Sequence, residues 1–475
     1  MFRQILAINI FLLNVLVVAC AVSPTNATSP VATIVPSATA TATPPRIAPA
    51  TITPTRVASN VTAPTSTLVQ SWSSARAINW ITSHNSLAQP NIVKPRVGVS
   101  FIDPVFNTSL VRLTDARAKK IPGIFPDYSK RQAWNADESL LLLRTGDGNT
   151  LLYDGATYQF KKSLDEVGGE DVFWHPTNPS LIYYNPDNTL YSYNVVTDER
   201  KKIFAFADYA FANTRGEGNL SRDGRWYALV GQLYSNAAGT TFKDLLVFDL
   251  STNQIVSRLA LPKSLNDFDW ASISPRGNFV VVDYATDQTA RFNGVEVYDR
   301  NFKLVWQKPL GAGHSDLSID ANGDEVLVMD WYDADKNVTL IKKFRLSDGK
   351  ETILLDFSAY FDSHISCRNE QRPEWCFIST FDYVGRLTDD AKSWLPFEDE
   401  VFALKLDGSG EVQRIAHHHS RRYSPTSPDS DRSNYFAEPH ATASRNGERI
   451  LFGSNWRENV ADPMSVDAYV VDWRK

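Results

Sequence analysis

The sequence predicts an all-β protein, a seven-bladed β-propeller, and three observations carry that prediction. First, among the 475 residues, 25 Phe, 18 Tyr and 12 Trp stand beside 23 Gly and 25 Pro, which combines strand-favouring aromatics with turn formers. Second, one short phrase of turn and strand recurs along the chain. Third, it recurs at intervals of roughly 40 to 55 residues, which is the length of a four-stranded propeller blade.

The recurring phrase is a Ser, then a turn in which Gly stands beside Asn or Asp, then a short apolar strand. Such turns supply the positive φ angles that a tight connection between two antiparallel strands requires. Clear copies begin at Ser221, Ser274, Asp320 and Ser444, degenerate copies begin at Asn135 and His175, and the hairpin containing Cys367 and Cys376 supplies the seventh. We therefore predict seven blades of four strands each.

The two ends of the repeat region predict that the ring closes. After the last turn, only two strands follow, at residues 450–453 and 468–472, so the final blade lacks its outer strand. An unassigned strand, residues 109–114, precedes the first unit. Supplying this strand to the last blade would remove an open sheet edge. A pair of β-sandwiches is the alternative, but it does not explain a repeat of this length.

These units resemble TolB-type, WD-repeat-like β-propeller repeats, in which a similar turn introduces an apolar strand. The resemblance covers residues 98–475 and implies the propeller fold. It indicates little about function, because such propellers serve as binding platforms, peptidase lids and enzymes.

The N-terminus predicts export and lipid anchoring. Residues 1–19 contain Arg3 followed by an apolar stretch typical of a secretion signal, and they end in Val-Val-Ala before Cys20. This resembles a bacterial lipobox, in which the thiol of Cys20 is acylated; an ordinary signal peptide or an uncleaved anchor is the alternative. We expect a lipid-anchored protein that faces the periplasm or the exterior and meets the membrane only through this anchor.

Residues 20–70 predict a disordered tether, because 35 of the 50 residues from 21 to 70 are Ala, Ser, Thr or Pro and only Arg46 and Arg56 are charged. Residues 71–97 predict a segment that packs on the propeller rim, with a short amphipathic helix around residues 75–81. The propeller itself is expected over residues 98–475.

Composition also bounds the partners. The formal net charge is -6 and there is no long basic run, which argues against nucleic-acid binding. No Gly-rich phosphate loop is present, so no nucleotide is expected. Cys367 and Cys376 flank a short polar loop and predict a disulfide in an exported protein, with two buried thiols as the alternative. All three cysteines then have a role, and a cysteine enzyme is not expected.

Ionisable residues at the starts of the predicted inner strands are candidates for a site in the central channel. The channel-lining set is Arg131, Asp171, Glu217, Asp269, His314, Asp316, His364, Glu438 and His440. Several such groups around one channel make a candidate site. The simpler interpretation is that propeller channels are wet and commonly polar.

The histidines form the sharper part of this set. His314, His364 and His440 fall in the last three blades, and with Glu438 they would provide ligands for Zn²⁺ or Mn²⁺. Alternatively, each is an ordinary buried histidine. The run His417–His419 follows a predicted strand and is expected to end it on a solvated loop rather than to bind metal.

This histidine arrangement distantly resembles that of oligogalacturonate lyases, which are seven-bladed propellers with a divalent metal and a His base. Their last-blade motif is Gln-x-x-His-x-His, and the corresponding residues here are Tyr435, Glu438 and His440, of which only His440 matches. The resemblance implies that Glu438, His440, His314 and His364 are metal ligands.

Two functions therefore follow from the sequence. The first is a binding platform for a protein or glycan ligand at the cell envelope. The alternative is a metal-dependent extracellular polysaccharide lyase or hydrolase with a His-lined site in the channel, in which the metal would neutralise a uronate carboxylate while a His removes the α-proton.

Overall fold

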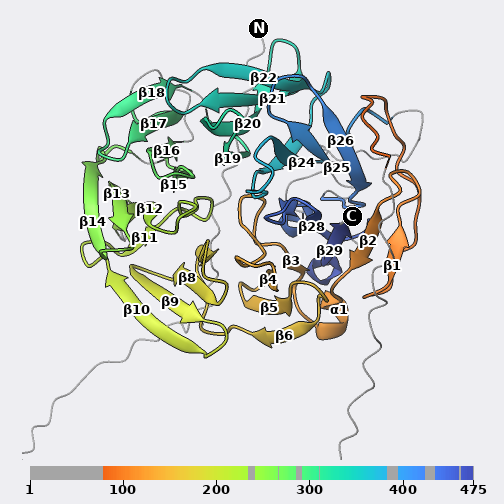
Figure 1. The fold of residues 1–475 in the computed structure, drawn as a ribbon, viewed down its shortest axis with the longest axis horizontal. Coiled ribbons are helices and arrows are strands. Elements are labelled where there is room, and N and C mark those ends of the chain that lie inside the picture. The colour runs from red at the N-terminus through yellow and green to blue at the C-terminus, as the bar shows by residue number, and fades with distance from the viewer. Residues whose placement is uncertain are drawn as a thin grey trace, which may run out of the picture. The chain divides into compact units, whose positions relative to one another are not determined.

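The computed structural model describes residues 79–473 apart from residues 234–240, 266, 285–290, 310, 382–393, 423–433 and 459–461. Within these residues the strands form seven antiparallel sheets arranged around an axis (Figure 1). Each sheet is a blade whose first strand lies innermost. The seven-bladed β-propeller predicted from the repeat is confirmed.

Blades one to three have four strands each. Blade one contains β3 (Ile124–Phe125), β4 (Leu140–Thr145), β5 (Thr150–Asp154) and β6 (Phe160–Ser163). Blade two contains β7 (Asp171–Trp174), β8 (Leu181–Asn185), β9 (Thr189–Asn194) and β10 (Glu199–Ala205). Blade three contains β11 (Phe211–Asn213), β12 (Trp226–Leu233), β13 (Thr241–Asp249) and β14 (Gln254–Ala260).

Blades four to six repeat this plan. Blade four contains β15 (Trp270–Ile273), β16 (Phe279–Asp283), β17 (Val295–Asp299) and β18 (Leu304–Lys308). Blade five contains β19 (Ser315–Ile319), β20 (Glu325–Asp333), β21 (Val338–Arg345) and β22 (Glu351–Asp356). Blade six contains β23 (Asp362–Ser366), β24 (Trp375–Phe381), β25 (Glu400–Lys405) and β26 (Val412–His417).

Blade seven joins both ends of the described chain. It contains β27 (Thr442–Ala443), β28 (Arg449–Ser454), β29 (Asp467–Asp472), β2 (Ser109–Arg112) and β1 (Ser100–Ile102). The pairing of β2 with β29, in which Leu110 lies opposite Val471, is the predicted closure. The outermost strand β1 was not predicted. Three short helical turns complete the elements of the described residues: α1 (Ala116–Lys119), η3 (Tyr435–Ala437) and η4 (Pro463–Ser465).

The recurring Ser-turn-strand phrase has a direct physical reason. The turn glycine adopts a positive φ, for example 73° at Gly224 and 74° at Gly277. The hydroxyl of Ser221 accepts a hydrogen bond of 2.9 Å from the backbone N–H of Trp226, at the start of the next strand. Ser274 does the same for Phe279. The Ser therefore fixes the chain across the turn, and Gly allows the turn to close.

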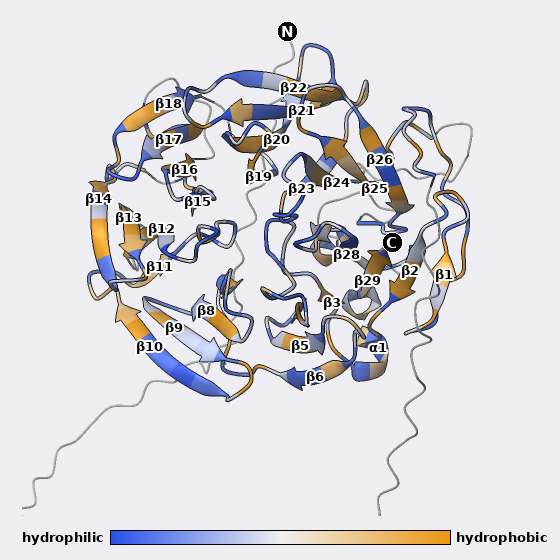
Figure 2. Ribbon diagram, in the orientation of Figure 1, coloured by the Kyte–Doolittle hydropathy of each residue, from blue (hydrophilic) through white to orange (hydrophobic). Residues whose placement is uncertain are grey.

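Burial follows the blade order. The middle strands of the blades are almost wholly buried, and apolar clusters fill the spaces between neighbouring blades. The outer strand β10 begins with four exposed, charged residues and becomes hydrophobic toward its end (Figure 2). The predicted disulfide is present between Cys367 and Cys376, with Cα atoms 4.5 Å apart and both side chains buried.

The described part of the rim segment, residues 79–97, contains no helix and makes isolated bridges at Ile81 and Val97, so the expected helix is absent from residues 79–81. The physical reason is that Ile81 pairs with Arg414 at the outer edge of β26. The backbone N–H of Arg414 donates to the Ile81 carbonyl at 3.0 Å. Backbone pairing with a sheet edge replaces pairing within a helix. Residues 75–78 lie outside the described residues.

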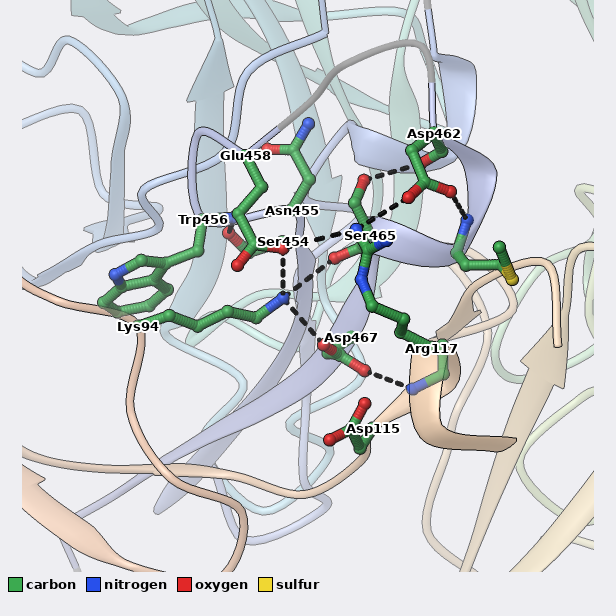
Figure 3. Close-up of polar contacts among 12 residues, drawn as sticks. Lys94, Asp115, Arg117, Ser454, Asn455, Trp456, Glu458, Asp462, Ser465 and Asp467 are labelled. Atoms are coloured by element: carbon green, nitrogen blue, oxygen red, sulfur yellow. Dashed lines mark hydrogen bonds and ion pairs between the residues drawn. The ribbon is translucent and has the colours of Figure 1, made fainter. Parts of the chain in front are cut away.

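The end of this segment is held by a polar cluster on blade seven (Figure 3). The Lys94 ammonium lies 3.0 Å from Asp467 and 3.1 Å from Glu458, and it donates to the Ser465 carbonyl. Arg112 of β2 also pairs with Asp467, at 2.9 Å. Asp467 therefore joins the rim segment, the closing strand and the last strand of the ring.

The expectations for residues 1–19, for lipidated Cys20 and for the tether at 20–70 fall outside the described residues and stay predictions. Among the helices that the structure describes, none is long and apolar enough to cross a bilayer.

Candidate functional site

The candidate site lies where the inner strands of blades five, six and seven begin. His364 is in β23, His314 immediately precedes β19, and His440 lies two residues before β27. Because the blades repeat one plan around the ring, these starts meet at one mouth of the channel. The ring centroid of His364 is 4.2 Å from that of His314 and 4.2 Å from that of His440. The three predicted histidines therefore come together.

His364, Glu438 and His440 form the first group, which we call the metal group. The Nε2 atom of His364 lies 2.8 Å from Oε2 of Glu438, and Nε2 of His440 lies 3.5 Å from the same oxygen. All three side chains are buried, and one ligand atom from each lies within 4.8 Å of the others. Nδ1 of His364 and Nε2 of His440 make no hydrogen bond to a described residue. Buried polar atoms of this kind mark a place for a ligand.

The electrostatics of the metal group favour neutral imidazoles. Burial, together with the neighbouring His440, His314 and Arg422, holds the pKa of His364 well below its usual range. Burial and the charges of His314 and Arg422 lower the pKa of His440 to about 3. Burial raises the pKa of Glu438 to about 8, although the Arg422 guanidinium, which contacts Oε1, opposes this rise. Neutral imidazole is the form that binds metal.

His314 belongs to a second group with Asp330 and Asp362. Its Nδ1 lies 3.0 Å from Oδ1 of Asp362 and 3.7 Å from Oδ2 of Asp330. Burial lowers the pKa of His314, but the two carboxylates outweigh burial and hold the pKa well above its usual value. The sequence placed His314 in one metal set with the others. In the structure its ring touches that of His364, while its Nδ1 is held by these two carboxylates.

Aromatic rings surround the metal group. Tyr128 packs against both His364, at 5.5 Å between centroids, and His440, at 5.1 Å. Tyr435 lies 5.1 Å from His440 and is 43% exposed. Phe381 stacks on His364. This apolar surround strengthens electrostatic interactions within the site.

Two of the predicted channel carboxylates are structural. Asp171 pairs with Arg131 at 2.6 Å and also accepts hydrogen bonds from Thr214 and from the hydroxyl of Tyr227. Asp316 accepts two hydrogen bonds from Arg368, at 2.7 and 2.9 Å. Because these buried charges are fully paired, Arg131, Asp171 and Asp316 are not free to bind a ligand.

Glu217 and Asp269 form a second wall of the channel. Glu217 pairs with the buried ammonium of Lys130 at 2.5 Å, and this ammonium also lies 4.2 Å from the ring centre of Trp270. Burial, reinforced by Glu217 and Asp283, raises the pKa of Asp269 well above its usual value. Lys130 therefore places one cation near the carboxyl groups of Glu217 and Asp269.

Sequence reasoning did not single out Asp330, Asp362, Tyr128, Arg422 or Lys130. A signal existed for Asp362, since residues two apart in a strand share a face and Asp362 stands two before His364. Lys130 is adjacent to the predicted Arg131. No local signal marks Asp330, Tyr128 or Arg422, because each reaches the site through the arrangement of the blades.

The histidine run 417–419 ends β26, as expected, but it is buried rather than solvated. His417 contacts the Leu87 carbonyl, and His418 contacts the Thr380 carbonyl at 2.8 Å. His419 stacks on Trp456. The expected solvated loop was wrong because residues 79–97 and blade seven cover this strand end.

Solved propeller structures are similar to this chain. An oligogalacturonate lyase in complex with manganese matches with a TM-score of 0.55 and 15% identity, over 79% of this chain and 96% of its own. An oligogalacturonate lyase from Vibrio parahaemolyticus matches with a TM-score of 0.57 and 15% identity, over 79% and 97%. The Pan2 WD40 domain of Neurospora crassa has a TM-score of 0.45 and 11% identity, over 77% and 94%.

At these identities the matches show the fold alone. The chain is a β-propeller with distant structural similarity to oligogalacturonate lyase. No protein-family model matches the sequence, and no curated protein matches it.

Proposed function

We propose that this protein binds a divalent metal ion in its channel and acts as a lyase or hydrolase on an acidic polysaccharide. The observation that carries the proposal is the metal group: two buried imidazoles and one carboxyl group converge, and Nε2 of His440, which faces Glu438, has no hydrogen-bond partner among the described residues. Two nitrogens and one carboxylate oxygen suit Zn²⁺ or Mn²⁺. Similarity to lyase structures, one of them recorded with manganese, supports the same choice.

His364, Glu438 and His440 would hold the ion, and one ion bound there would neutralise the carboxylate of a uronate and so acidify its α-proton. Arg422 fixes Glu438 by contacting Oε1. This contact leaves Oε2, the oxygen that faces both imidazoles, to bind the ion. Tyr435, which is partly exposed beside His440, offers a ring face on which a sugar would stack.

Tyr128 is the residue placed to move a proton. Its ring lies against both ligand histidines, and its hydroxyl is not engaged by another side chain of the described residues. Burial and the nearby Glu217 raise the pKa of Tyr128 well above its usual value, so its hydroxyl stays protonated and would donate a proton as a general acid. The family resemblance implies a histidine base without giving its position. His314 is the histidine of the site outside the metal group, and its Nδ1 lies 3.0 Å from Asp362 and 3.7 Å from Asp330.

The first test is the metal content of the purified full-length protein after dialysis without chelator. We expect at least one Zn or Mn per chain, lost in His440→Ala and kept in the surface variant His84→Ala. Metal-loaded protein is then offered polygalacturonate and other acidic polysaccharides, with the ultraviolet absorbance of an unsaturated uronate and new reducing ends as readouts. A wild-type chain without stoichiometric metal would contradict the proposal.

A binding platform for a protein or glycan at the cell envelope is the second candidate. The observation that favours it is a run of exposed apolar residues at the outer edge of blade seven, namely Val93, Val97, Val99 and Ile102. Exposed apolar patches mark interaction surfaces. An envelope partner that is retained by the wild type and lost in Val99→Asp would support this role, and equal retention by both would contradict it.

A further inference from the structure

The group of His314, Asp330 and Asp362 lies directly beside the metal group and offers a second set of ligand atoms. One nitrogen and two carboxylate oxygens lie within 4.8 Å of one another. The side chains are 27%, 12% and 19% exposed, so they are largely enclosed yet reached from the channel. They come from the start of blade five, from β20 and from β23.

The charges in this group are incompletely matched. Nδ1 of His314 can donate one hydrogen bond, and Oδ1 of Asp362 at 3.0 Å is its partner. Oδ2 of Asp330, at 3.7 Å, lies beyond hydrogen-bond distance from the same nitrogen. The two carboxyl groups thus share one imidazole, and Asp330 has no cation of its own at hydrogen-bond distance among the described residues. A divalent cation would match both charges.

Both carboxylates are fixed in position by neighbouring groups. The hydroxyl of Ser363 donates to Oδ2 of Asp330 at 3.1 Å, and its backbone N–H donates to Oδ1 of Asp362 at 3.1 Å. The backbone N–H of His314 donates to Oδ1 of Asp330 at 2.9 Å. Such hydrogen bonds orient the carboxylates that bind metals in proteins.

The two groups are adjacent. The rings of His314 and His364 lie 4.2 Å apart between centroids, and His364 is fully buried with an Nδ1 that has no partner among the described residues. Two-metal sites in proteins hold their ions about 3.5–4 Å apart. The two ligand sets of the channel are therefore neighbours, as the ligand sets of a two-metal site must be.

We propose that His314, Asp330 and Asp362 bind a second divalent cation, which makes the channel site binuclear. Because neutral imidazole is the form that binds metal, the ion would displace the proton of the His314 ring. One nitrogen and two carboxylates form a harder set than the metal group, so Mn²⁺ suits both positions. This goes beyond the proposed function, which needs one ion. In a two-metal site the ions together orient a substrate and stabilise both the attacking and the leaving oxygen, which is the chemistry of hydrolysis.

The test is a titration of full-length protein with Mn²⁺ alone. We expect about two Mn per chain by elemental analysis, and an electron paramagnetic resonance spectrum that shows coupling between two ions. Asp330→Asn should retain one Mn per chain and lose the coupling. Asp362→Asn, from a different blade, should do the same, which guards against a folding defect in either variant. Asp348→Asn, which removes a surface carboxylate paired with Arg345, should keep both ions.

The outcomes separate this inference from the proposed function. One Mn in the wild type, unchanged in Asp330→Asn, would overturn the second site and leave the first, and His314 would then be a proton-carrying residue held by two carboxylates. No Mn in the wild type would overturn both. Two Mn that show no magnetic coupling, or that survive in both Asn variants, would also overturn the binuclear site.

Discussion

At the scale of single residues, burial and neighbouring charge give chemically identical histidines different roles. His440 has a pKa lowered to about 3 by burial and by His314 and Arg422, whereas His314 is held between two carboxylates that raise its pKa. The rings of both lie 4.2 Å from that of His364. Burial dominates at His440 although Glu438 lies nearby, whereas at His314 the two carboxylates of Asp362 and Asp330 together outweigh burial.

His419 provides a pH test that is separate from the metal group. Burial, with Arg457 and His418 nearby, lowers its pKa to about 3. Because the unfolded chain takes up this proton near pH 6.5, the unfolded state binds more protons between pH 3 and 6.5. This contribution to stability is complete above pH 6.5 and is lost as the pH falls toward 3.

We therefore expect His419 to account for about 2 kcal/mol of the stability lost between pH 6.5 and 5. The comparison is the urea unfolding free energy of wild type and His419→Asn at both pH values; Asn suits the positive φ of 53° at this position. The variant should lose less on acidification. Equal losses would contradict the assignment.

Some residues of the candidate site could be predicted from the sequence and others could not. His314, His364, Glu438 and His440 could be found because each stands at the start of a predicted inner strand. Asp330 could not, because it lies past the middle of β20 and reaches His314 only through the pairing of β20 with β19. Asp171 and Asp316 were predicted with equal reason, but their Arg partners come from other blades.

At the scale of elements, the outer edge of β26 is protected by the rim segment. Arg414 in this strand forms a buried pair with Glu400 on β25, and it donates to the carbonyls of Ser83 and Asn85. The buried guanidinium thus links the last two strands of blade six to the extended segment. An uncovered edge would be open to pairing with another chain.

Arg414→Met should destabilise the fold by about 3–5 kcal/mol, because it leaves Glu400 buried without its cation. Hydrogen exchange at residues 81–85 should accelerate at the same time, since their carbonyl anchors are lost. Lys336→Met, which removes an exposed ion pair with Asp333, should cost at most about 1 kcal/mol. Unchanged exchange at residues 81–85 would show that other contacts hold the segment.

The disulfide between Cys367 and Cys376 also stabilises blade six. Cys367 and Cys376 are 9 residues apart, and closing such a loop stabilises a fold by roughly 2–3 kcal/mol. Reductant should therefore lower the denaturation midpoint of the wild type. A Cys367→Ser, Cys376→Ser double variant should start from the lower midpoint and show no response. A response in the double variant would point to another effect of the reductant.

At the scale of the whole molecule, the ring was predictable because its information is local and repeated. The Gly in each of the four clear copies of the turn phrase adopts a positive φ, and the seven copies together indicate seven blades. The partner of β2 was predictable by counting strands, since blade seven was one short. Strand β1 was not predicted, because it is only three residues long, Ser100–Ile102, and it extends blade seven beyond the four strands that the repeat indicates.

Ring closure is tested by placing a charge on the closing strand. Leu110 is fully buried in β2, opposite Val471 of β29, and it belongs to the cluster that fills blade seven. Leu110→Asp would bury a charge without a partner and would weaken the pairing of β2 with β29. We expect a loss of at least about 3 kcal/mol in the free energy of unfolding.

The matched control is Ile102→Asp in β1, because Ile102 is 42% exposed at the outer edge of the same blade. This variant should change stability by no more than about 0.5 kcal/mol. Leu110→Asp should also expose the edge of β29, so that concentration-dependent association appears in analytical ultracentrifugation while Ile102→Asp behaves as wild type. If Leu110→Asp were as stable and as monodisperse as Ile102→Asp, closure by β2 would not be what holds the seven blades together.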